Sequence, residues 1–147
     1  MTKLEQLQTM WAEDAAINST NVEASILMVP KLHAKYLREL GVQRIKLAVE
    51  DGKHKQALLK AWQFIDEGPS KENMKEWGEK FDINNIPTTQ KQKEHHFEAD
   101  PDVIDANVKL AYQKEIVEFL KEVLKEIGQL QWHIKNLIEN RKFLAGN

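Results

Sequence analysis

The chain has 147 residues, of which 41% are hydrophobic and 30% are charged, with 21 basic against 23 acidic side chains. This size allows one ordinary domain with its own core, and this balance is typical of a soluble, helix-rich protein. The absence of cysteine excludes disulfides and thiolate chemistry, and no apolar run approaches the roughly 20 residues that span a bilayer. The start is amphipathic and unlike a signal peptide, so we expect a cytoplasmic protein with no membrane partner.

Positive charge is concentrated in one part of this net-negative chain. Residues 31–60 carry eight basic and three acidic side chains, a net charge of +5, whereas residues 1–30 carry a net charge of −3. A basic segment in an acidic chain is typical of a surface that binds an anion, and nucleic acid is the commonest large one. The alternative is that these lysines and arginines are helix formers on a solvated face.

The first elements in chain order are predicted to be helices. Apolar residues at helical spacing indicate a short amphipathic helix over residues 4–16. Thr20 and Glu23 then have the spacing of a capping box, which predicts the start of a second helix. Within that helix Pro30 predicts a kink or a break near Val29.

Glycines punctuate the next stretch. Gly41 is a plausible C-terminal cap for the second helix. A further helix is predicted from about Val42 to Asp66, with Gly52 as a weak point that could split it. Gly68 and the proline that follows it are expected to end this helix.

Residues 69–101 are polar and hold few apolar anchors. Within them, residues 71–80 predict a short helix. The stretch DINNIPTTQKQKEHHFEADPD, residues 82–102, is rich in polar and turn-forming residues. We therefore predict a loop there.

The last third of the chain has the clearest pattern. Apolar residues recur in alternating steps of four and three, which is a heptad seam interrupted only at Arg141. The apolar stripe is wider than a plain seam, and a broad stripe indicates a bundle or an assembly of several subunits. The alternative is that this helix packs only against its own chain, but its length favours self-association. The residues predicted to form the oligomer contact are Ile116, Leu120, Val123, Ile127, Leu130, Ile134 and Leu137.

These elements predict a mainly α fold with a long C-terminal amphipathic helix that assembles a homo-oligomer. We divide the chain into a helical region over residues 1–101, which holds the candidate nucleic-acid-binding segment 31–60 and the polar loop 69–101, and an oligomerisation helix over residues 102–147. The two parts are expected to form one compact unit.

Motifs for chemistry are missing from the sequence. The six glycines are isolated, so there is no glycine-rich phosphate loop. His95 and His96 are adjacent and have no further metal ligands at a suitable spacing. No serine has a visible base partner, and no carboxylate pair stands out. We therefore expect no enzyme, no metal and no cofactor.

Binding of single-stranded nucleic acid would need lysines that follow the phosphates and aromatic rings that stack on bases. The aromatic candidates are Tyr36, Trp62, Phe64 and Trp77, each of which could instead belong to the core. Trp62 points about 200° away from Lys60 around a helix, so we predict that Trp62 is buried.

Short segments spread over nearly the whole chain resemble one known family. They are LEQLQ at 4–8, KYL at 35–37, ALLKA from residue 57, ADPDV at 99–103 and the tail IKNLIENRKFLAGN. In this order they are similar to the UvsY family of phage recombination mediator proteins. No single one of these motifs is specific, and the resemblance rests on the ordered series.

The resemblance implies a protein that is not an enzyme and acts in the cytoplasm of an infected bacterial host. It implies a ring-like homo-oligomer, a hexamer or heptamer, joined through the C-terminal helices. It also implies binding of single-stranded DNA, so that a RecA-like phage recombinase replaces the single-strand-binding protein on that DNA.

The family's DNA-binding basic residues lie in the segment that matches residues 57–68, and Lys60 falls on one of them. Trp62 stands where a second basic residue is expected, and nearby lysines are candidates for the missing charge. The predicted DNA-binding residues are Lys60, Lys53, Lys55, Lys46 and Arg44. Two alternatives stay open, namely a helical protein–protein adaptor without DNA binding and an enzyme whose site the sequence does not reveal.

Overall fold

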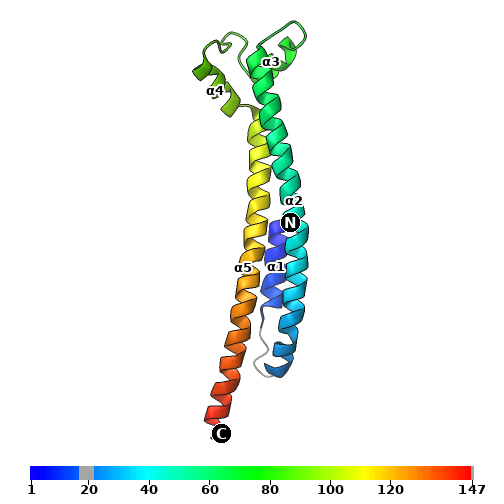
Figure 1. Ribbon diagram of the computed structural model, residues 1–147, viewed down its shortest axis with the longest axis vertical. Coiled ribbons are helices and arrows are strands. Elements are labelled where there is room, and N and C mark those ends of the chain that lie inside the picture. The colour runs from blue at the N-terminus through cyan, green and yellow to red at the C-terminus, as the bar shows by residue number, and fades with distance from the viewer. Residues whose placement is uncertain (17–21, 147) are drawn as a thin grey trace. The chain divides into compact units, whose positions relative to one another are not determined.

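The computed structural model describes residues 1–16 and 22–146, and this part of the chain contains helices and no strand (Figure 1). The prediction of a mainly α fold is therefore confirmed. No helix in the described ranges is both long and apolar enough to cross a membrane. The elements are α1 (Lys3–Asp14), α2 (Val22–Glu67), α3 (Met74–Lys80), α4 (Gln90–Glu98) and α5 (Pro101–Leu144).

Helix α1 begins with a capping box and lies close to its predicted bounds. The backbone N–H of Glu5 donates to Thr2 Oγ1 at 3.2 Å, and the backbone N–H of Thr2 donates to Glu5 Oε2 at 2.8 Å. These bonds satisfy donors that have no partner inside the helix. The second predicted capping box, at Thr20 and Glu23, begins outside the described residues.

Helix α2 is one continuous helix, so the predicted cap at Gly41 and the possible split at Gly52 are wrong. Pro30 also lies inside it without breaking it. Gly41 and Gly52 keep helical backbone, because only Gly68 and Gly146 have positive φ among the described residues. Gly68, at φ 74°, lies just after the last helical residue, and there the predicted stop is confirmed.

The polar middle section holds two short helices. Helix α3 confirms the prediction for residues 71–80. Helix α4 lies inside the stretch predicted as a loop, so that prediction is wrong for residues 90–98. A capping box explains the difference: the backbone N–H of Gln92 donates to Thr89 Oγ1 at 3.2 Å, and that of Thr89 donates to Gln92 Oε1 at 3.3 Å.

Helix α5 starts at the ADPDV motif, where Asp100 precedes a proline. Asp100 is fully buried, and its Oδ1 accepts the backbone N–H of Asp102 at 2.8 Å. Proline at the first helical position loses no hydrogen bond, because the N–H it lacks would have no partner there. The sequence order Asp-Pro-Asp therefore fixes the beginning of α5.

The chain forms two compact units, which are described separately. Unit 1 consists of Met1–Ile45 and Lys114–Asn147, and unit 2 consists of Lys46–Gln113. This division concerns packing. The predicted division into residues 1–101 and 102–147 concerns function and stays a prediction.

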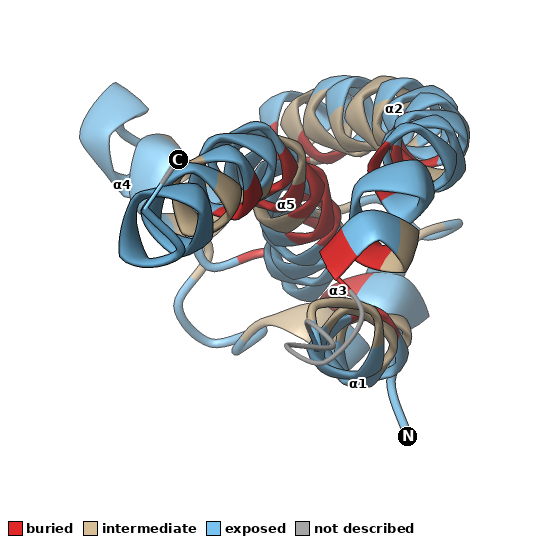
Figure 2. Cartoon of the chain, turned by 90° about the horizontal axis from the view of Figure 1, so that it is seen from below, coloured by how far each residue is buried: buried red, intermediate tan, exposed pale blue. Residues whose placement is uncertain are grey.

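In unit 1, α1 packs beside the first half of α2 and the second half of α5 (Figure 1). Leu7 of α1 and Tyr36 of α2 are buried, and the Trp11 ring meets the Tyr36 ring edge-on at 5.4 Å. Figure 2 shows the buried positions of α5 gathered along one side of the helix.

In unit 2, aromatic rings form the core around Trp77. The Trp77 ring is stacked on Phe64 with centroids 5.0 Å apart and also contacts Phe81. Trp62 is half-buried and meets Phe97 edge-on at 5.6 Å. The predicted burial of Trp62 is therefore partial, with one ring contact to α4.

Candidate nucleic-acid interface

The five basic residues predicted to bind DNA all lie on α2, and all are exposed. They do not share one face. Lys46, Lys53 and Lys60 are spaced by seven residues, so they project from nearly the same side, about 10 Å apart along the axis. Arg44 and Lys55 share a different side, roughly 140–180° away around the helix. We call Lys46, Lys53 and Lys60 the lysine face.

Two of these lysines form ion pairs within α2. Lys53 lies 3.7 Å from Glu50, and Lys55 lies 3.0 Å from Asp51. The lysine side chains are largely exposed, and exposed pairs of this kind contribute little to stability. A phosphate could therefore replace the carboxylate at small cost.

Lys60 lies near the start of α5, in the same unit. Hydrogen bonding and charge from Lys80 hold the pKa of Asp102 below its ordinary value of 3.8, and the charge of Lys60 adds to this effect. Lys80 Nζ lies 2.8 Å from Asp102 and 3.4 Å from Asp100. Lys60 is itself exposed, so its ammonium group is open to solvent.

The aromatic candidates for base stacking are not exposed platforms. Tyr36 and Trp77 are buried, and Trp62 and Phe64 are half-buried in contact with other rings. In contrast, Trp132 of α5 is 61% exposed, and the sequence reasoning missed it. The signal was present, because Trp132 stands between polar residues and off the heptad seam.

A second basic cluster lies in unit 1. From the sequence its residues contributed only to the net charge of residues 31–60. Lys31, Lys35 and Arg38 line a hollow of about 410 Å³ on α2. The ammonium group of Lys35 already has partners within the chain. Its Nζ donates to Asp14 at 2.6 Å and lies 5.6 Å from the Tyr36 ring centre. Lys31 and Arg38 are exposed.

The residues predicted to join subunits fall into two groups. Leu130 and Leu137 are half-buried, and an apolar groove lined by Ile26, Val29, Ile134 and Ile138 lies in the same unit. The other five are already covered within this chain, each at most 2% exposed: Ile116, Leu120, Val123, Ile127 and Ile134.

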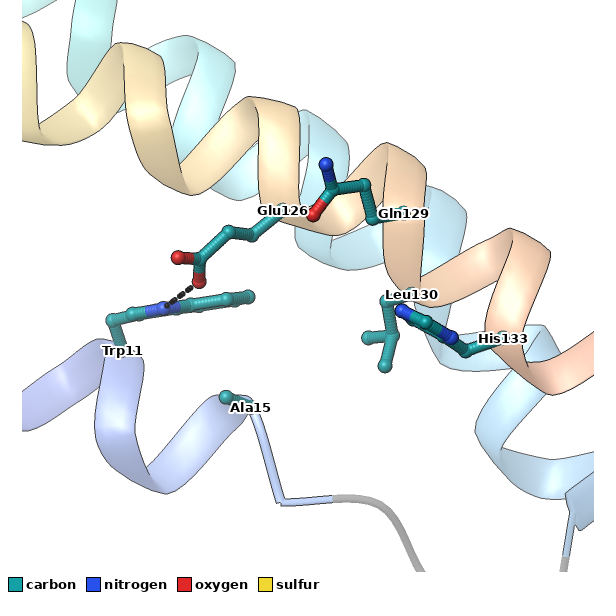
Figure 3. Close-up of a pocket in the computed structure, with 6 residues that line it drawn as sticks. All are labelled: Trp11, Ala15, Glu126, Gln129, Leu130 and His133. Carbon is teal, nitrogen blue, oxygen red and sulfur yellow. Dashed lines mark hydrogen bonds between the residues drawn. The ribbon is translucent and has the colours of Figure 1, made fainter.

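A hollow of about 250 Å³ lies where α1 meets α5 (Figure 3). Trp11 Nε1–H donates to Glu126 Oε2 at 3.0 Å across it, with Leu130 and His133 on the α5 side. This hydrogen bond joins residues 115 positions apart in the sequence. The hollow is shallow and offers one carboxylate already in use.

His95 and His96 lie in α4, where the His96 ring packs against Phe81 at 5.0 Å. Within residues 1–16 and 22–146, no group of three or more His, Asp or Glu side chains could hold a metal ion.

A sequence profile of the family described as "Recombination, repair and ssDNA binding protein UvsY" matches residues 10–147. The chain belongs to the UvsY family. The UvsY family is thus one of recombination, repair and single-stranded-DNA-binding proteins, and no catalytic activity is part of that description. A search of curated proteins finds no match.

Crystal structures of the bacteriophage T4 recombination mediator protein UvsY share this fold. In lattice type II the TM-score is 0.79 at 23% identity, over 99% of this chain and 99% of that chain. In lattice type IV the TM-score is 0.75 at 19% identity, over 97% and 98%. In lattice type I it is 0.75 at 21% identity, over 94% and 98%.

Proposed function

We propose that this chain is a recombination mediator that binds single-stranded DNA and promotes loading of a RecA-like recombinase in place of single-strand-binding protein. The match to the UvsY family over residues 10–147 carries this proposal. The exposed lysine face of α2 supports it with a surface of suitable charge. The protein acts by binding and positioning, without catalysis.

The lysine face fits the backbone of a single strand. Its three ammonium groups follow one side of a helix at intervals of about 10 Å, which is within reach of phosphates along an extended strand. Three phosphate contacts give weak binding. A ring-like oligomer multiplies them, because each further subunit meets the same strand at high effective concentration.

Two variants that remove equal charge test this assignment. Lys53→Ala/Lys60→Ala removes two charges from the lysine face, and Arg44→Ala/Lys55→Ala removes two from the other side of the same helix. We expect the first to weaken binding of oligo-dT and to reduce the slope of log K against log salt by about 1.4. The measurement is fluorescence anisotropy over a salt series.

The second double variant is the control, because each pair contains one lysine with an ion pair inside α2. It should keep the wild-type salt slope. Equal losses in both variants would show that only overall charge matters and that DNA does not lie on the lysine face. Absence of wild-type binding at low salt would leave the adaptor interpretation in its place.

The mediator role needs a separate measurement. We expect the protein to shorten the lag before a RecA-like recombinase hydrolyses ATP on a strand coated with single-strand-binding protein. On a bare strand the lag should change little, because there is no bound protein to replace. A lag that is unchanged on the coated strand would leave a DNA-binding protein without loading activity.

We also propose that the chain assembles into a ring-like homo-oligomer through α5. Because five residues of the heptad seam are buried within the chain, the contact between subunits would use the half-buried Leu130 and Leu137. Exposed apolar residues in the same unit, including Leu27, Phe143 and Leu144, support a contact at this end of α5.

A further inference from the structure

Trp132 lines an open hollow on α5. The hollow has a volume of about 500 Å³ and is lined by Lys125, Gly128, Gln129, Trp132 and His133. Gly128 lies one helical turn before Trp132, and a methyl group added to it would meet no atom within 4 Å. The space beside the indole ring is therefore open to a ligand.

The ring is poorly covered by the protein itself. Trp132 is 61% exposed, and among residues 1–16 and 22–146 its ring contact is an edge-on approach to His133 with centroids 5.4 Å apart. An indole ring normally buries a large apolar area on folding or binding. Because the Trp132 ring stays exposed to water, a ligand that covers it would gain the free energy of burying this area. A flat ligand could recover it.

The surroundings of the ring select the kind of ligand. Lys125 projects from the same side of α5 seven residues earlier, about 10 Å away, and forms no ion pair with any described residue. The lining also holds the amide of Gln129 and the imidazole of His133, so it is more polar than the groove at Ile26 and Ile138 in the same unit. An aromatic face amid a free ammonium group, an amide and an imidazole suits a nucleobase with its phosphate.

We propose that Trp132 is a base-stacking platform for single-stranded DNA, with Lys125 meeting a neighbouring phosphate. This inference rests on the proposed function and adds a contact to bases, which the lysine face of α2 does not supply. Stacking on one aromatic side chain tolerates any base, so the contact would not impose sequence specificity.

The test compares oligo-dT with an abasic strand of the same length and charge, using full-length protein. Trp132→Leu keeps an apolar side chain but removes the aromatic face. We expect it to weaken binding of oligo-dT about 5- to 150-fold and to leave binding of the abasic strand unchanged. Trp132→Phe should keep part of the preference for oligo-dT over the abasic strand.

The other possible results would overturn either the stacking role of Trp132 or the proposed function. Equal binding of oligo-dT by wild type and Trp132→Leu, or an equal loss on both strands, would overturn the stacking role while leaving the proposed function in place. A change in oligomeric state of Trp132→Leu in sedimentation would also overturn it and make this face a contact between copies. If wild-type protein binds no oligo-dT at low salt, the proposed function itself fails.

Lys125 has its own matched control. Lys121 lies one turn earlier on α5 and pairs with Glu118 at 3.0 Å. Lys125→Gln should weaken both strands alike, because both keep their phosphates, and Lys121→Gln should have a smaller effect. A larger loss for Lys121→Gln would exclude Lys125 as the phosphate contact.

Discussion

Asp14 holds α1 to α2 through a short polar contact. Its Oδ2 accepts hydrogen bonds from Lys35 Nζ at 2.6 Å and from the Tyr36 hydroxyl at 2.8 Å. Burial raises the pKa of Asp14, but hydrogen bonds from Lys35 and Tyr36 outweigh burial and lower the pKa below 3.8. Burial and the Asp14 carboxylate together raise the pKa of Tyr36, so its hydroxyl stays a donor throughout the physiological range.

The sign of this shift gives a pH-dependent prediction. A carboxyl group with a lowered pKa in the folded state contributes stability that is present above its unfolded value and is lost as pH falls through the folded value. We expect Asp14→Asn to lower the free energy of unfolding by about 1 kcal/mol at pH 7, because charge-assisted hydrogen bonds are lost. That difference should shrink below pH 3.8.

Urea unfolding at several pH values between 3 and 7 would measure it. The exposed neighbour Glu13 provides the control, and Glu13→Gln should change the free energy of unfolding much less than Asp14→Asn does. A constant difference for Asp14→Asn over the same range would show that its carboxylate is not held by these two donors.

At the scale of elements, the sequence predicted which segments are helical better than it predicted where each helix begins and ends. The sequence predicted α1, α3 and α5 without naming any cap, from apolar residues at helical spacing. It failed at Gly41 because a glycine signals a cap only when the backbone turns left-handed, and that choice depends on tertiary packing. Leu40 and Gln43, buried on either side of it, keep the helix continuous.

The α4 error had a different cause. The residues Gln90–Glu98 have no strong apolar periodicity, and their helix depends on one capping box and on packing of Phe97 against Trp62. The partner lies in α2, far away in sequence. Such contacts cannot be inferred from local spacing alone.

Alanine substitutions at the glycines in and just after α2 should change the free energy of unfolding in opposite directions. Gly41 and Gly52 are helical, and a methyl group on either would meet no atom within 4 Å. Gly41→Ala and Gly52→Ala should each raise the free energy of unfolding by about 0.5–1 kcal/mol. Gly68→Ala should lower it, because Gly68 has φ 74°.

Thermal or urea unfolding of the three single variants would check these signs. A destabilised Gly52→Ala variant would mean that another chain approaches α2 closely at that position. Gly68→Asn serves as the control, since asparagine tolerates a left-handed backbone better than alanine does.

At the scale of the whole molecule, the sequence located the positive charge in residues 31–60, which lie within α2. Arg44 and Lys55 were predicted to bind DNA together with the lysine face, but helix geometry puts them on another side of α2, and their role stays a prediction. Trp132 was not predicted as a stacking residue, because the aromatic candidates were taken from residues 36–77, in and near the basic segment. The heptad seam identified buried positions of α5 but could not tell whether its own chain or another would bury them.

Assembly can be separated from folding by two leucines. Leu137→Glu places a charge at a half-buried position of α5 that is proposed to meet another subunit, so we expect the oligomer to dissociate. Leu59→Glu changes an exposed leucine of α2 by the same chemistry and should leave assembly unchanged.

Light scattering gives the mass of each variant, and circular dichroism reports whether its helices remain. A Leu137→Glu variant that stays fully assembled would remove α5 from the contact. Leu130→Glu should also dissociate the oligomer, although its side chain lines the hollow beside Trp11 and the change would disturb α1 as well.

The hydrogen bond between Trp11 and Glu126 has a consequence for how the protein is made. A ribosome that adds about 5–20 residues per second needs roughly 6 to 23 seconds to pass from the donor to the acceptor. The contacts of Asp14 with Lys35 and Tyr36 are available within the first seconds of that interval. Helix α1 is therefore held against nascent α2 first. The hydrogen bond of Trp11 can form only near the end of translation, when Glu126 has been synthesised.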